Sequence, residues 1–137
     1  MQDRFKFRFF TKDEFNPEFN GMFKVHSLHA GTNKVIISSK YGNCSVKLED
    51  GILMQCTGLK DKNGKLIYEG DIARFKDNIN PDGSNTHIGV IEHNETFNAF
   101  MYRVECMGLF TVNKIQNENF DVEIIGNIYE NPELLEV

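Results

Sequence analysis

Short runs in which apolar and polar residues alternate dominate the chain and predict β-strands. Residues 5–9 alternate strictly, which places three Phe on one face of a strand and Lys6 and Arg8 on the other. In all, about nine candidate strands and almost no long amphipathic helix predict a mainly β fold of short antiparallel strands, such as a small barrel. Other clear segments are residues 22–30, 35–38, 44–48, 88–91, 99–104, 109–112 and 122–125.

The stretch Met54–Ile72 carries the strongest turn signal of the chain. Asp61 and Gly64 suit the first and last positions of a type I turn, whereas Asn63–Gly64 also suits a two-residue type I′ loop. Both alternatives reverse the chain at Asn63–Gly64, so the stretch predicts a hairpin that sets the register of the β core. Two further glycines predict a bulge or bend before the turn and a break after it: Gly58 and Gly70.

Composition and charge describe an ordinary folded protein. The 137 residues are 40% hydrophobic and 26% charged, which fits one compact domain or two small lobes. The net charge of -5 argues against attraction of the whole surface to nucleic acid or an anionic membrane, and a local basic patch stays open. Residues 1–12 carry +3 and residues 113–137 carry -5, so the two ends could attract each other within one fold or between subunits.

Cysteine usage and hydropathy indicate the compartment. Cys44, Cys56 and Cys106 are an odd set with no CxxC pair, which favours free thiols in a reducing cytosol. The N-terminus has no apolar segment typical of a signal peptide, and no apolar run is long enough to span a bilayer. We therefore expect a cytoplasmic protein that does not engage a membrane.

Histidines offer weak candidates for a metal site. His26 and His29 have an HxxH spacing, but in a regular strand their rings point to opposite faces. His87 and His93 flank a strand and could combine with Cys106, with no recognised motif behind that set. Ordinary surface or core histidines are the favoured interpretation, and we expect no metal or other cofactor.

Glu69 and Asp71 are the best candidates for acid–base chemistry. They would share a face if the chain between them is extended, and paired carboxylates can act as general acid and base. The favoured alternative is structural: Asp71 caps backbone donors at the break caused by Gly70, and Glu69 offsets nearby lysines. No P-loop, GxGxxG, GxSxG or HExxH motif is present, so we expect no enzyme and no catalytic residue.

Basic residues at the hairpin tip and in the first strand form the candidate binding surface. Such a surface could contact phosphates, and the Phe/Lys/Arg strand could stack bases. The favoured alternatives are a solvated hairpin end that discourages aggregation and a strand whose Phe residues fill the core. The surface comprises Lys6, Arg8, Lys60, Lys62, Asn63, Lys65 and Arg74.

Three stretches of the chain resemble a known family. The C-terminal stretch Ile124–Leu135 contains a short helix start, with Asn131 as N-cap and Pro132 at the first helical position. Together with Leu53–Ile72 and the aromatic, basic start Phe5–Arg8, it resembles the YopX family, small proteins found mainly in phages and prophages of Gram-positive hosts. The residues that form this signature are Gly58, Gly64, Gly70, Asp71, Gly126, Asn131 and Pro132. Cys56 and Phe10 depart from the aromatic and the Trp usual in the family.

The resemblance implies a fold and little chemistry. It implies a β-rich N-terminal subdomain over residues 1–50 and a part similar to an SH3-like barrel over residues 51–137, or one continuous unit. The family offers no catalytic residue to carry over. Our first hypothesis is a non-enzymatic phage or prophage accessory protein in the cytoplasm of the bacterial host, which self-associates or binds a host or phage protein. The alternative is a nucleic-acid-binding protein that uses the candidate binding surface.

Overall fold

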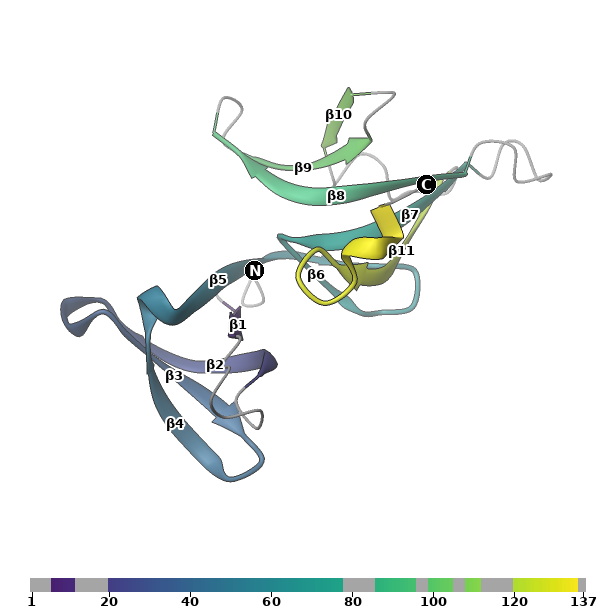
Figure 1. Ribbon diagram of the computed structural model, residues 1–137. Coiled ribbons are helices and arrows are strands. Elements are labelled where there is room, and N and C mark those ends of the chain that lie inside the picture. The colour runs from purple at the N-terminus through teal and green to yellow at the C-terminus, as the bar shows by residue number, and fades with distance from the viewer. Residues whose placement is uncertain are drawn as a thin grey trace. The chain divides into compact units, whose positions relative to one another are not determined.

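The structure is a computed structural model, and it describes residues 6–11, 20–77, 86–95, 99–104, 108–111 and 120–135. Within these residues the chain forms β-strands and short 3-10 helices without an α-helix, which confirms the mainly β class (Figure 1). The strands are β1 (Phe7–Thr11), β2 (Gly21–His29), β3 (Lys34–Ser39), β4 (Gly42–Lys47), β5 (Gly51–Lys60), β6 (Leu66–Tyr68), β7 (Asp71–Asp77), β8 (Thr86–Asn94), β9 (Ala99–Val104), β10 (Gly108–Thr111) and β11 (Phe120–Asn127). The 3-10 helices are η3 (Ala30–Thr32), η4 (Leu48–Asp50) and η5 (Pro132–Leu135). None of the described residues belongs to a helix that could cross a membrane.

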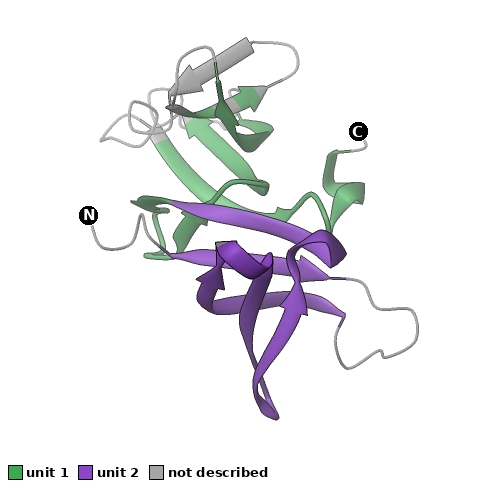
Figure 2. Cartoon of the chain, turned by 90° about the vertical axis from the view of Figure 1, so that its left-hand side faces the viewer, with its two compact units in different colours: residues 1, 57–137 green, residues 2–56 purple. Residues whose placement is uncertain are grey.

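Two compact units divide the chain, residues 2–56 and residues 57–137 (Figure 2). The boundary falls inside β5, so the first part of this strand belongs to one unit and its end to the other. The division expected from the sequence, between residues 50 and 51, lies at the start of the same strand and stays a prediction.

The 2–56 unit is one antiparallel sheet with strand order β4-β3-β2-β1-β5. Phe9, Val35 and Ile37 are fully buried on one face and form its core, as the alternation of apolar and polar residues predicts. Gly51 has no room for a side chain, because a Cβ there would meet the Phe9 ring and the backbone oxygen of Phe10. Close approach of β5 to β1 therefore depends on a glycine at this position.

A β-bulge in β2 decides which of its side chains face away from the core. The register between β2 and β3 shifts between Val25 and Ser27, so that Lys24 lies opposite Ser38 while His29 lies opposite Lys34. Residues 24 and 29 would point to opposite faces of a regular strand, and the inserted residue brings them to the same face.

The 57–137 unit contains a five-stranded antiparallel sheet with order β10-β9-β8-β7-β11, and β6 lies beside the end of β5. Its core consists of Ile67, Ala73, Ile91, Val122 and Ile124, with Leu59, Phe75 and Phe100 packed against them. Strand β8 covers residues 86–94, whereas the sequence predicts a strand over residues 88–91 only. The additional residues pair with β7 before this segment and with β9 after it. The SH3-like barrel implied for this part stays a prediction.

Candidate functional site

The hairpin tip is a three-residue loop closed by Asp61 and Lys65. The Asp61 N–H donates to the Lys65 carbonyl at 2.8 Å, and the Gly64 N–H donates to the Asp61 carbonyl at 3.0 Å. Gly64 has a φ of +83°, whereas Asn63 keeps a negative φ. A type I turn followed by a left-handed glycine has this geometry, so the reversal at Asn63–Gly64 is confirmed and the type I′ alternative is wrong.

The Asp61 side chain fastens this loop to a distant strand. One carboxylate oxygen, Oδ1, accepts the N–H groups of Asn63 and Lys65 at 2.9 Å each. The other, Oδ2, accepts the N–H of Ile124 in β11 at 3.0 Å. The Lys62 N–H adds a bond of 2.9 Å to the Val122 carbonyl. Asp61 is only 5% exposed, so its charge serves backbone donors instead of a ligand in solution.

One acidic residue, Glu123, offsets part of the positive charge of the candidate binding surface. A single carboxylate oxygen, Glu123 Oε2, lies 3.5 Å from Lys62 Nζ and 3.6 Å from Arg74 Nη1. Lys60, Asn63 and Lys65 are exposed at or beside the loop. Exposed ion pairs of this kind add little stability, about 0–1 kcal/mol, but they lower the positive potential that a phosphate would meet at the tip.

The first strand contributes two members of the candidate binding surface. Lys6 is exposed immediately before β1, and its carbonyl accepts the Cys56 N–H at 2.9 Å. Arg8 is half-buried and lies opposite Lys24 in β2. The neighbouring Phe9 is fully buried, so this Phe packs in the core, as the structural interpretation of the strand requires. Phe5 lies outside the described residues.

Gly70 and Asp71 bond to three separate segments of the 57–137 unit. Gly70 has a φ of +86°, its N–H donates to the Ile91 carbonyl at 2.7 Å, and its own carbonyl accepts the Ile128 N–H at 2.9 Å. Asp71 is 1% exposed, and its Oδ2 accepts the Tyr68 N–H at 2.8 Å, which confirms the interpretation that it caps backbone donors. The premise for an acid–base pair is wrong, because residues 69 and 70 form a turn instead of an extended segment. Gly58, where the sequence predicts a bulge or bend, has a φ of +84°, which departs from regular strand geometry.

The C-terminal motif folds back on itself around Gly126. A Cβ at this position would lie 2.6 Å from Asn131 Oδ1, so only glycine fits beneath that side chain. Pro132 opens η5 and Asn131 precedes it, as the sequence predicts. The Asn131 side chain, however, accepts a hydrogen bond from the Asn127 N–H at 3.2 Å and not from the helix. The first N–H of the helix to be bonded, that of Leu134, donates to the Asn131 backbone carbonyl at 3.1 Å. Asn131 therefore closes the turn as well as starting the helix.

The histidines engage neighbouring side chains. The His87 ring stacks on Phe75 with centroids 6.4 Å apart, and His93 meets Phe100 edge-on at 5.4 Å. His29 Nε2 lies 3.1 Å from Ser27 Oγ, and Cys106 lies outside the described residues. In the described ranges, no three or more His, Cys, Asp or Glu side chains gather as a metal site would require.

A basic surface that the sequence analysis did not identify lies on the 2–56 unit. Directly opposed residues of β2, β3 and β4 form three rows on the face away from the core, and we call this set the basic face. The rows are His29–Lys34–Lys47, Ser27–Ile36–Ser45 and Lys24–Ser38–Asn43. One sequence signal could have revealed it: strands β1 to β4 contain no Asp or Glu.

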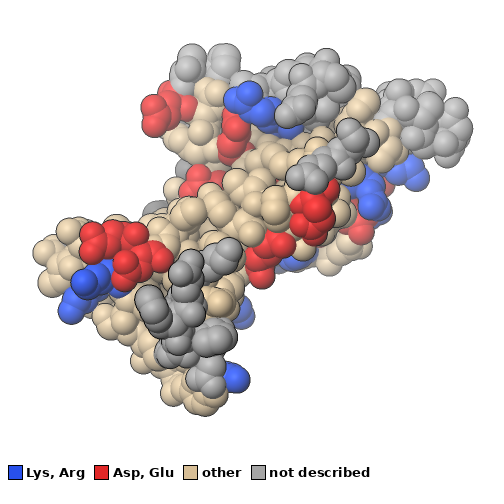
Figure 3. Space-filling view, in the orientation of Figure 1, with Lys and Arg blue, Asp and Glu red and all other residues tan. Residues whose placement is uncertain are grey.

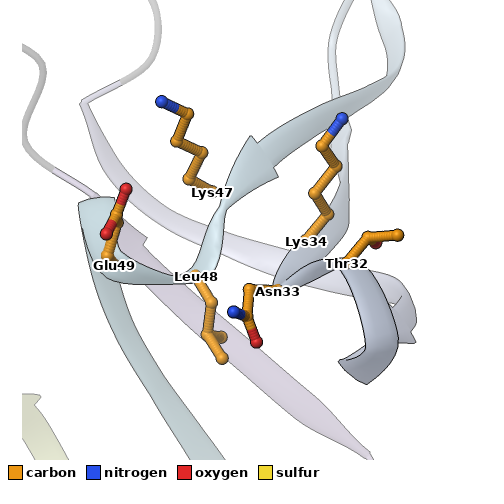
Figure 4. Close-up of a pocket in the computed structure, with 6 residues that line it drawn as sticks. All are labelled: Thr32, Asn33, Lys34, Lys47, Leu48 and Glu49. Carbon is orange, nitrogen blue, oxygen red and sulfur yellow. The ribbon is translucent and has the colours of Figure 1, made fainter.

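The first row borders a pocket of about 440 Å³ within the same unit. The lining residues, drawn in Figure 4, are Thr32, Asn33, Lys34, Lys47, Leu48 and Glu49. Lys34 and Lys47 extend to one side of the strand pair, whereas Asn33 and Leu48 extend to the other (Figure 4). The two lysines thus belong to the basic face, and Glu49 is an acid at its edge.

Comparisons with known proteins agree with this architecture. The model of the YopX protein family matches residues 6–136. The crystal structure of protein yopX from Bacillus subtilis is similar, with a TM-score of 0.62 and 18% identity over 96% of this chain and 98% of that one. Protein EF1440 from Enterococcus faecalis has a TM-score of 0.60 and 27% identity over 95% and 96% of the two chains. A search of curated proteins gave no match. Since the family model covers almost the whole sequence, this chain belongs to the YopX family.

Proposed function

We propose that this chain is a non-enzymatic binding module of phage or prophage type, which acts in the host cytoplasm by holding another macromolecule or a second copy of itself. The hydrogen bonds of two buried aspartates support this role. The carboxylates of Asp61 and Asp71 accept backbone N–H groups. Carboxylates that accept backbone hydrogen bonds stabilise the fold, so recognition of another molecule falls to the exposed side chains of the surface.

Capture from a host lysate tests this role. The tagged chain should retain a reproducible partner, or form a defined oligomer in light scattering at several concentrations. A Lys60→Glu/Lys62→Glu/Lys65→Glu variant tests whether the hairpin tip is the contact surface, because these side chains are exposed and their reversal leaves the core intact. A strictly monomeric chain that captures no partner would contradict the proposal.

Nucleic-acid binding is the second candidate, and the lysines of the basic face favour it. In the part of the chain that the structure describes, Lys24, Lys34 and Lys47 form no ion pair with an acid. Lys62 and Arg74 of the candidate binding surface, by contrast, share Glu123. Uncompensated lysines are the groups that contact phosphates in sequence-independent binding. A salt-dependent shift of labelled DNA or RNA tests this candidate.

A further inference from the structure

We propose that the basic face of the 2–56 unit binds the phosphate backbone of nucleic acid. The site rests on the proposed binding role and adds to it a location and the chemical class of the ligand. It differs from the candidate binding surface deduced from sequence, which placed the contacts at the hairpin tip and the first strand. Lys24, Lys34, Lys47 and His29 supply its cationic or polar donors, and all four are exposed.

Lys34 and Lys47 bring two positive charges unusually close together. They stand directly opposite each other in β3 and β4. The Leu48 N–H donates to the Asn33 carbonyl at 2.8 Å, a bond that flanks the lysine pair, so the pair is of the non-hydrogen-bonded type. Side chains in such pairs lie closest across the sheet, with Cβ atoms about 4.5–5.5 Å apart, and like charges there repel. An anion seated between the two ammonium groups would relieve this repulsion.

No acid from the four strands compensates these charges. Strands β1 to β4 contribute Arg8, Lys24, Lys34 and Lys47 and neither Asp nor Glu. In the face that Figure 3 shows, basic and acidic side chains lie next to each other over both units. Two exposed acids, Glu49 and Asp50, follow β4 in η4, and Glu49 lines the pocket beside Lys34 and Lys47. The protein therefore has a local cationic surface despite its net charge of -5.

The neutral members of the basic face also suit phosphates. Ser27, Ser38 and Ser45 present hydroxyl groups and Asn43 presents an amide, and these groups commonly donate to phosphate oxygens. Ile36 is the one apolar residue of the nine, and none of the nine is Phe, Tyr or Trp. The imidazole of His29 is the single aromatic ring of the face, which is too little for a platform that stacks successive bases. We therefore expect binding that depends on phosphate charge and is independent of base sequence.

The size of the face fits several phosphates. Lys34 and Ser38 are four residues apart in β3, and a strand advances about 3.3 Å per residue, so the outer rows lie roughly 13 Å apart. Duplex DNA carries one negative charge per about 1.7 Å of its axis, so several phosphates lie within that span. Lys24 at one end and the Lys34–Lys47 pair at the other can then contact different phosphates.

Fluorescence anisotropy with a labelled 20-nucleotide DNA, single-stranded and as duplex, tests the site in the full chain. We compare the wild type with Lys24→Gln/Lys34→Gln/Lys47→Gln and with a matched control, Lys60→Gln/Lys62→Gln/Lys65→Gln. Both variants remove three exposed charges. The basic-face variant should bind more weakly at 50 mM salt. Its slope of log K against log salt should fall by about 0.7–0.9 per lysine that contacts a phosphate, whereas the control keeps most of the wild-type slope.

Three results would overturn the site. They are no binding of either DNA by the wild type at 50 mM salt, an equal loss in the hairpin control, or competition by polyglutamate as effective as that by unlabelled DNA. If the basic-face variant does not fold, Glu49→Gln replaces it and should bind DNA more tightly than the wild type; unchanged or weaker binding then refutes the site. Persistent self-association or partner capture alongside any of these results would leave the proposed binding role standing.

Discussion

Replacing Asp61 by alanine removes the carboxylate that fastens the hairpin loop to β11. Three backbone N–H groups lose their acceptor: those of Asn63, Lys65 and Ile124. Asn63 and Lys65 are exposed, so water can replace the carboxylate at their N–H groups. The Ile124 N–H lies in a buried residue of the core strand and has no such replacement, since Ile124 is 8% exposed.

The expected loss follows from these three bonds. Each exposed bond contributes about 0.5–1.5 kcal/mol, and a hydrogen bond from a buried donor to a charged group contributes about 1.5–3 kcal/mol. Asp61→Ala should therefore lower the free energy of unfolding by roughly 2.5–6 kcal/mol. Asp61→Asn can keep an oxygen toward the loop and presents an NH₂ group to Ile124, so it should lose about 1.5–3 kcal/mol.

Urea unfolding followed by circular dichroism measures these losses, and hydrogen exchange at the Ile124 amide shows where they arise. Asp50→Ala is the matched control, because Asp50 is exposed and its replacement should change stability by no more than about 0.5 kcal/mol. If Asp61→Ala unfolds within 0.5 kcal/mol of the wild type, or if the Ile124 amide keeps its protection, the carboxylate does not fasten the loop.

Three further substitutions show which residues contribute strongly to the stability of the fold and which contribute little. Gly126→Ala should cost about 1–3 kcal/mol in urea unfolding, because its Cβ would lie 2.6 Å from Asn131 Oδ1, and an unchanged midpoint would refute the close approach. Gly70→Ala should cost roughly 1–2 kcal/mol, since its φ is +86°; equal stability in thermal melts would contradict this. Lys62→Ala should change stability by less than about 1 kcal/mol, because its ion pair with Glu123 is exposed, and a larger loss would show that the pair holds the loop.

Local patterns predicted most of the strands and the main turn. The sequence predicted a strand over residues 99–104, as the partner of residues 88–91, and these are the bounds that β9 has. The turn residues located the reversal at Asn63–Gly64, because a left-handed glycine and an aspartate that accepts nearby N–H groups are local features of the sequence. The absence of Asp and Glu from β1 to β4 can also be seen in the sequence. The register of the strands is needed, however, to show that their lysines share one face.

Contacts between distant segments could not be predicted in the same way. The bond from the Ile124 N–H to the Asp61 carboxylate joins residues 63 positions apart, and no sequence pattern in either segment predicts it. The bulge at residue 26 is a second case, because one inserted residue reverses the face of every later side chain in β2. The neutralisation of Lys62 and Arg74 by Glu123 likewise needs two segments brought together by folding.

The Lys47→Glu variant tests the central claim, that this chain is a binding module whose basic face is kept for a ligand and not for stability. The substitution turns the repulsive Lys34–Lys47 pair into an attractive one, so the free energy of unfolding should rise by about 0.2–1 kcal/mol. In the same sample, affinity for the labelled DNA should fall and its salt slope should decrease by about one. The account predicts these opposite changes in stability and affinity; a variant that is more stable and binds DNA as tightly as the wild type would contradict it.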